Sequence, residues 1–124
     1  VSYQSKGLPI AVRETFENKV AMEKGRQIFY ERIGQLNLSC AQCHEERAGL
    51  KLGGAVIPQG HPNAYPIYRI EWQTLGSLQR RLRNCMSGVR AQQFDYGSPE
   101  MAQLELFLAR RARGLPLESP GVRP

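Results

Sequence analysis

The sequence has no uninterrupted apolar run long enough for a membrane-spanning helix, because charged residues break its most apolar stretches every few positions. It also lacks an opening in which a basic segment precedes an apolar one. The chain starts VSYQSKGLPI, so we expect any export signal to have been removed already. Neither an internal repeat nor a convincing run of alternating apolar and polar residues is present. These absences favour a small helical domain without a membrane span.

The composition is that of one modest globular domain, with 124 residues, of which 41% are hydrophobic and 23% charged. Lys and Arg number 17 against 11 Asp and Glu, which gives a net charge of +6. The basic residues are mostly arginines scattered along predicted helices, so nucleic-acid binding is disfavoured. An anionic substrate or an acidic partner agrees better with this charge.

Apolar periodicity predicts helices over 18–34, 74–87 and 98–114. Gly25 interrupts the first helix at a cost in stability, which indicates the close approach of another backbone. In the second, Leu75, Leu78, Leu82 and Cys85 fall on one apolar face. The expected N-caps of the second and third helices are Thr74 and Ser98.

The remaining segments carry turn residues. A turn and short helix are expected over 39–46, and the many glycines and prolines of 50–71 predict an irregular loop. We interpret 1–17 as a connector or the end of a preceding domain, 18–114 as the domain, and the proline-rich 115–124 as an extended tail. The fold class expected is therefore all-α, a small bundle around a prosthetic group.

The strongest motif is Cys40-Ala41-Gln42-Cys43-His44, the C-x-x-C-H spacing of covalent c-type haem attachment. Thiols at this spacing on a helical turn reach both vinyl groups of one porphyrin. The histidine that follows projects its imidazole toward the iron from the same face. The motif predicts one haem c, held by Cys40 and Cys43 with His44 as the proximal ligand.

Two other uses of these cysteines are less favoured. A structural zinc site can be assembled from Cys40, Cys43, Cys85 and either His44 or His61, but the usual second close pair of ligands is missing. A thioredoxin-like motif belongs near a βαβ pattern, which this sequence does not have.

The sixth ligand of the iron has several candidates, which are Cys85, His61, Met86, Met101 and Met22. Met101 and Met22 fall on apolar stripes and are expected to pack in the core. Met86 points about 100° away from Cys85 around the same helix. His61, in a loop, is most simply a solvated residue, but neutral imidazole is a good haem ligand and His61 stays the second choice.

Cys85 can be read in two ways. A free cysteine on an apolar helix face is often just a small buried hydrophobe. Its neighbours, however, are arginines, which lower a thiol's pKa and favour the thiolate. Arg81 lies one turn before Cys85, so both side chains share nearly the same face. From the residues alone, Cys85 is an open candidate for the iron ligand.

Three long blocks of the chain resemble the C-terminal haem domain of the SoxA family, the catalytic subunits of the SoxAX cytochromes of bacterial thiosulfate oxidation. They are GRQIFYERIGQLNLSCAQCHEERAG, GHPNAYPIYRIEWQTLGSLQRRLRNCMSGVRA and YGSPEMAQLELFLARRARGLP, and the opening QSKGLPI is similar to the end of the family's preceding domain. The resemblance implies a class-I-like cytochrome c domain. It matches Cys40, Cys43 and His44 to the haem motif, and Cys85 to the distal ligand and catalytic sulfur, which can carry a persulfide. Arg81 matches the arginine that holds the anionic substrate.

The resemblance also implies an activity, an L-cysteine S-thiosulfotransferase that joins thiosulfate to a cysteine of the carrier SoxYZ and passes electrons through the partner cytochrome SoxX, in the periplasm. The alternative is a simple periplasmic electron-transfer cytochrome c with His/Met or His/His ligation, which needs neither Cys85 nor Arg81. A bare interaction module is a third possibility. The chain departs from the family in being about half its usual length. It also offers only Lys51 where members tend to carry a further arginine.

Overall fold

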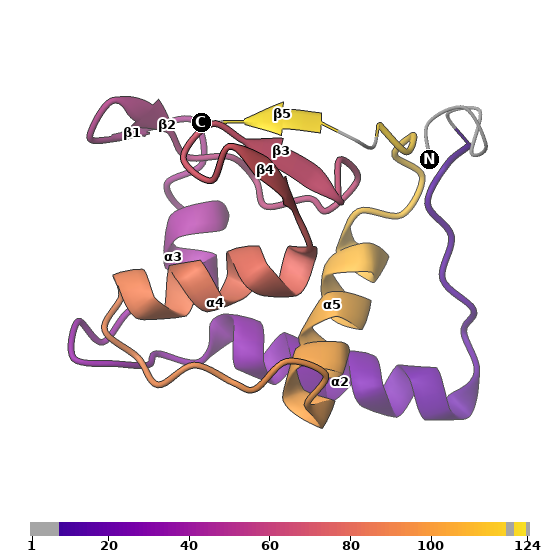
Figure 1. Cartoon of the computed structure of the whole chain (residues 1–124). Coiled ribbons are helices and arrows are strands. Elements are labelled where there is room, and N and C mark those ends of the chain that lie inside the picture. The colour runs from indigo at the N-terminus through magenta and orange to yellow at the C-terminus, as the bar shows by residue number, and fades with distance from the viewer. Residues whose placement is uncertain (1–7, 119–120, 124) are drawn as a thin grey trace.

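The computed structural model describes residues 8–118 and 121–123. Its helices are α2 (Phe16–Tyr30), α3 (Cys40–His44), α4 (Leu78–Gly88) and α5 (Pro99–Arg111). α2 packs against α5 and α3, and α4 packs against α5. In Figure 1, α5 crosses α2, and the small strands lie above α4, on the opposite side of the molecule from α2.

The crossing of α2 and α5 depends on a glycine. A Cβ atom at Gly25 would lie 2.0 Å from the backbone oxygen of Gln103, so only glycine permits this approach of the two backbones. The close approach inferred from the sequence is thereby confirmed. The buried cluster beside the crossing draws residues from all these helices: Phe29, Ala41, Met86, Met101, Leu104 and Leu108.

The first helix lies earlier in the chain than predicted. The side chain of Thr15 accepts a hydrogen bond from the backbone N–H of Asn18 at 3.2 Å, which starts α2 at Phe16. The helix ends at Tyr30 instead of Gly34, because Ile33 turns back to form a β-bridge with Leu38. The prediction of a helix over 18–34 was right in kind and wrong at both ends.

The second helix begins later than predicted. Ser77, not Thr74, is its N-cap and accepts from the N–H of Arg80 at 3.2 Å. Thr74 instead pairs with Arg69 in a strand, and Leu75, which was expected on the buried helix face, is 53% exposed. The start of the third helix is confirmed, with Ser98 as N-cap and Pro99 in its first turn, but the helix ends at Arg111, before the predicted Gly114.

Short strands replace part of the expected irregular structure. β3 (Ile67–Arg69) pairs antiparallel with β4 (Thr74–Gly76) and parallel with β5 (Gly121–Arg123). β1 (Lys51–Leu52) and β2 (Ala55–Val56) form a separate hairpin. The all-α prediction therefore describes the core but not these sheets.

Two predictions about the ends of the chain have different outcomes. The tail 115–124 was expected to be extended, and its residues 121–123 form β5, which also pairs with β3, a regular pairing that was not predicted. The connector predicted over 1–17 lies partly outside the described residues, which begin at residue 8. The domain boundaries themselves stay predictions. No helix in the described ranges is both long and apolar enough to cross a membrane.

Candidate functional site

The C-x-x-C-H motif forms its own short helix, α3. Ser39 caps it in a reciprocal arrangement: its Oγ accepts from the N–H of Gln42, whose side chain accepts from the N–H of Ser39 at 2.8 Å. Cys40 and Cys43 are free thiols, both half-buried. The capping box therefore fixes the turn on which both thiols and His44 are displayed.

His44, the last residue of α3, has its ring oriented by the following loop. Its Nδ1 lies 2.7 Å from the carbonyl oxygen of Pro58. A carbonyl only accepts hydrogen bonds, so Nδ1 carries the proton and Nε2 is left with its lone pair available for a metal. Burial lowers the pKa of His44, which favours the neutral imidazole. The ring is thus in the tautomer and charge state of an iron ligand.

Gly60 lets the loop after α3 approach the His44 ring closely. Its φ is +78°, and a Cβ atom built there would lie 3.2 Å from Cγ and Nδ1 of His44. Any other residue would be strained at this φ and would crowd the imidazole. The contact between Gly60 and His44 is the second restraint on the ring.

Cys85 and Arg81 meet one turn apart on α4. Nη1 of Arg81 donates to Sγ of Cys85 at 3.1 Å, and both side chains are half-buried. The spacing in the sequence predicted this shared face, and the geometry confirms it. A guanidinium beside a sulfur places a fixed positive charge and hydrogen-bond donors where an anion can be held.

The residues predicted for the site lie within electrostatic range of one another. Burial and then the charge of Cys85 raise the pKa of Cys40 to about 11. The charges of Arg111 and then Arg81 contribute, after burial, to the lowered pKa of His44. Ala41 of α3 and Met86 of α4 lie in one buried cluster, with Cys40 and Leu82 packed against it, so the structure brings the haem motif and the Cys85–Arg81 pair close together.

The remaining ligand candidates are placed differently. Met22, Met86 and Met101 are buried, with exposures of 7%, 4% and 0%, and Met86 and Met101 belong to the core cluster. Nε2 of His61 lies 3.2 Å from Oε1 of Gln59, and its Nδ1 is buried without a hydrogen-bond partner in the described structure. Packing therefore accounts for the methionines, and His61 keeps one unsatisfied polar atom.

These residues suit haem better than zinc. Among the described residues, His, Cys, Asp and Glu side chains form no group of three or more that can hold a metal ion. The zinc alternative therefore has no geometric support. The neutral His44 with a free Nε2, the paired free thiols on one helical turn and a sulfur backed by arginine are instead the donors that a covalently held haem requires.

Sequence reasoning missed Arg111, at the end of α5. Its guanidinium donates to the carbonyls of Gln59 and His44, the latter at 3.4 Å, and its Nε lies 3.5 Å from Glu45 Oε1. In the sequence it is one of several arginines near a helix C-terminus, where a favourable interaction with the helix dipole already explains them. No local signal distinguishes it from Arg110.

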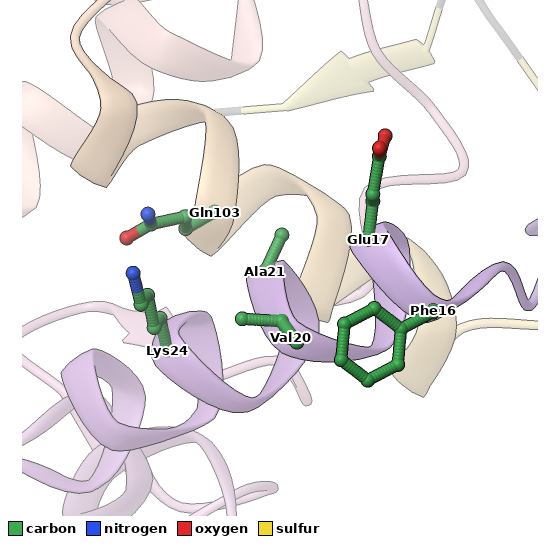
Figure 2. Close-up of a pocket in the computed structure, with 6 residues that line it drawn as sticks. All are labelled: Phe16, Glu17, Val20, Ala21, Lys24 and Gln103. Carbon is green, nitrogen blue, oxygen red and sulfur yellow. The ribbon is translucent and has the colours of Figure 1, made fainter.

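Lys51 and a surface hollow on α2 lie outside the contacts of the candidate site. Lys51, the one cation offered where the family tends to carry arginine, is exposed on β1. A shallow hollow on α2 is lined by none of the predicted site residues, as Figure 2 shows; its lining is Phe16, Glu17, Val20, Ala21, Lys24 and Gln103.

Comparison with known proteins gives this arrangement a class. The structure of SoxXA from P. pantotrophus matches with a TM-score of 0.94 and 36% identity, over 99% of this chain and 47% of that chain. The fold is that of a cytochrome c domain, a class whose cofactor is haem c.

The family follows from the sequence comparisons. The model of the SoxA/TsdA cytochrome c domain matches residues 24–117, and the chain belongs to that family. The L-cysteine S-thiosulfotransferase subunit SoxA of Rhodovulum sulfidophilum is 40% identical over 119 residues, 96% of this chain and 42% of that protein. The subunit of the same name from Paracoccus pantotrophus is 37% identical over 123 residues, 99% of this chain and 42% of that protein. The chain spans less than half the length of these curated relatives.

Proposed function

We propose that the chain is the sulfur-transferring haem domain of a SoxA-type L-cysteine S-thiosulfotransferase, with a class-I-like cytochrome c arrangement. One haem c would be held covalently by Cys40 and Cys43, and His44 and Cys85 would be its iron ligands. The observation that carries the proposal is the 3.1 Å contact from Arg81 to the Cys85 sulfur. An electron carrier has no use for a cation beside a thiol, whereas sulfur transfer to and from an anion needs both.

The reaction proposed joins thiosulfate to a carrier cysteine. In the first step, the Cys85 thiolate and the outer sulfur of thiosulfate form an S–S bond and lose two electrons to the redox chain, which leaves Cys85 as the adduct Sγ–S–SO₃⁻. In the second, the carrier thiolate attacks the middle sulfur, the bond to Sγ breaks, and Cys85 leaves as a thiolate. The carrier thiol thus gains the S–SO₃⁻ group, with one proton and two electrons released overall.

Arg81 has a defined task in both steps. Its fixed charge binds the thiosulfate dianion beside Sγ and offsets the negative charge that accumulates when two anions meet. The same charge stabilises Cys85 as the leaving thiolate. The bound haem c supplies the redox centre through which the electrons pass to the partner cytochrome.

The partners proposed follow from this chemistry and from the relatives. SoxX, named together with SoxA in the similar SoxXA structure, is the proposed permanent partner and electron acceptor. SoxYZ is the proposed carrier of the acceptor cysteine, and thiosulfate is the substrate. The proposed location is the periplasm, in agreement with a covalently attached haem c.

The test is electron paramagnetic resonance of the oxidised holoprotein, with Cys85→Ser beside wild type. We expect a low-spin thiolate-ligated signal that is absent from Cys85→Ser. Met86→Leu, the neighbouring residue in the core, is the matched control and should keep the signal. Mass spectrometry of the carrier after incubation with thiosulfate then shows whether the S–SO₃⁻ group is transferred.

The alternative function keeps one observation in its favour. The buried, unpartnered Nδ1 of His61 leaves the bis-histidine form of a simple electron-transfer cytochrome open to the same experiment. An unchanged spectrum in Cys85→Ser would take Cys85 off the iron and favour that electron carrier.

A further inference from the structure

Arg111 is placed where it touches the backbone around His44 without reaching any reacting atom. It is the last residue of α5, and its side chain is only 15% exposed. One guanidinium nitrogen donates to the carbonyl of Gln59 and another to the carbonyl of His44. The guanidinium also lies 4.9 Å from the ring centre of Phe29, a fully buried core residue. A largely buried arginine therefore packs on the core and donates to two backbone carbonyls.

Those two carbonyls belong to the two sides of one hydrogen bond. His44 provides the Nδ1 donor, and Pro58, the neighbour of Gln59, provides the accepting oxygen at 2.7 Å. The planar guanidinium of Arg111 thus binds the backbone carbonyl of His44, the donor residue, and that of Gln59, next to the accepting Pro58. Because a guanidinium is planar, its two donors fix the separation of the carbonyls they bind.

Glu45 and Tyr30 in turn orient the guanidinium of Arg111. Glu45 Oε1 forms an ion pair with Arg111 Nε at 3.5 Å, and the same carboxylate oxygen accepts a hydrogen bond from the hydroxyl of Tyr30 at 2.7 Å. The line of contacts runs from Tyr30 at the end of α2, through Glu45, to Arg111 at the end of α5. Elements far apart in the sequence therefore converge on the loop that orients the His44 ring.

We infer that Arg111 is a positioning residue that fixes the orientation of the proximal His44 imidazole, by fastening both sides of the hydrogen bond from His44 Nδ1 to Pro58. The inference rests on the proposed ligation of haem by His44. The orientation of an axial imidazole and the strength of its Nδ1 hydrogen bond set its basicity toward the metal. Arg111 thereby acts on the prosthetic group through His44 and not through substrate.

The experiment compares Arg111→Lys with Arg110→Lys in the full-length holoprotein purified with its subunits. Lysine keeps the charge but has no planar fork to hold two carbonyls. Arg110 is the matched control, since it is the preceding residue of the same helix and pairs instead with Glu14 at 3.0 Å. Covalent haem content is measured first, then the paramagnetic resonance spectrum of the oxidised protein and its thermal unfolding.

We expect Arg111→Lys to keep its haem while its low-spin signal broadens or splits into a second set of g-values, and Arg110→Lys to match wild type. If Arg111 has only a structural role, Arg111→Lys lowers the unfolding temperature and leaves the spectrum unchanged, and that result overturns the inference. Equal spectral changes in both variants overturn it too.

Glu45→Gln covers the case in which Arg111→Lys fails to accumulate. It removes the charge that orients Arg111 and should broaden the same signal to a smaller extent, whereas a wild-type spectrum in this variant overturns the inference. If wild type itself lacks covalent haem, the proposed function fails and this inference with it. If wild type holds haem but shows no thiolate-type signal, the proposed role of Cys85 fails, while the comparison of Arg111→Lys with Arg110→Lys still tests the role of Arg111. A normal wild-type spectrum with unaltered variants removes the role of Arg111 alone.

Discussion

The two sides of the site each have an arginine, but the two arginines contact different kinds of atom. Arg81 donates to the sulfur of Cys85 itself. Arg111 donates to the carbonyls of His44 and Gln59 and pairs with Glu45. A charge on a reacting atom changes the energy of the reaction, whereas a charge on the backbone changes where a ligand is held. In the proposed function, the Cys85 side accordingly carries the chemistry and the His44 side fixes a position.

The largest effect expected from this difference is on Arg81. Arg81→Ala should lower the rate of thiosulfate transfer to the carrier by about 10²–10³-fold, the typical loss for one charge-stabilising donor. The free energy of unfolding should change by less than about 1 kcal/mol, because the side chain is only half-buried. Steady-state transfer kinetics and denaturant unfolding measure the two quantities.

Arg80→Ala is the matched control for this prediction. Arg80 is the neighbouring arginine, but its guanidinium lies 4.2 Å from the ring centre of Trp72. It should therefore keep the wild-type rate, and Arg81→Lys should recover part of what alanine loses. If Arg80→Ala and Arg81→Ala were equally slow, the general positive charge of α4 would matter and the Arg81–Cys85 contact would not.

The two sides also differ in how far sequence alone predicts them. Arg81 and Cys85 are one helical turn apart, and Cys40, Cys43 and His44 share one turn, so local spacing places each group. Pro58, Gly60 and Arg111 reach His44 from distant parts of the chain, and no residue pattern connects them. Local periodicity predicts what one element presents, but not which loop closes over it.

The fold shows the same division. The start of the third helix, with its serine cap and first-turn proline, was predicted correctly, and Gly25 correctly indicated a close helix crossing. The sheet was missed because β3 and β5 are each three residues long and pair although they lie far apart in the sequence. Thr74 has the residue type of an N-cap, but it pairs with Arg69 in a strand too short to show a pattern of its own.

A smaller effect is expected on the His44 side from Gly60→Ala. Any side chain at φ +78° is strained by about 1–2 kcal/mol, and here the new Cβ atom also meets the His44 ring at 3.2 Å. We expect lower stability and a changed low-spin signal, with the rate of transfer falling less than in Arg81→Ala. Denaturant unfolding and paramagnetic resonance of the oxidised protein provide the readouts.

Gly97→Ala separates strain from contact. Its φ of +72° is similar, but a Cβ atom there meets nothing within 4 Å. It should lose stability by about the same strain, ~1 kcal/mol, and leave the spectrum unchanged. If Gly60→Ala and Gly97→Ala gave identical spectra, Gly60 would be needed only for the backbone conformation of the loop and not for the orientation of the His44 imidazole.

The smallest effect concerns Tyr30, the outermost residue of the Arg111 contacts. Its hydrogen bond to Glu45, then burial and the charge of Glu45, raise its pKa above the ordinary 10.0. A raised pKa means that the folded protein holds the phenol proton more tightly than the unfolded chain. The stabilisation is therefore complete below pH 10.0 and is lost as pH rises through the higher folded pKa.

Tyr30→Phe should cost about 0.5–1 kcal/mol of the free energy of unfolding at neutral pH and progressively less in strong alkali. Tyr96→Phe, which keeps the ring contact with Arg83 at 4.5 Å, should cost less at neutral pH. Denaturant unfolding from neutral to alkaline pH measures this cost. A loss that does not depend on pH would mean that the ring of Tyr30, and not its hydroxyl, supports Glu45, and Tyr30 would then have no part in holding Arg111.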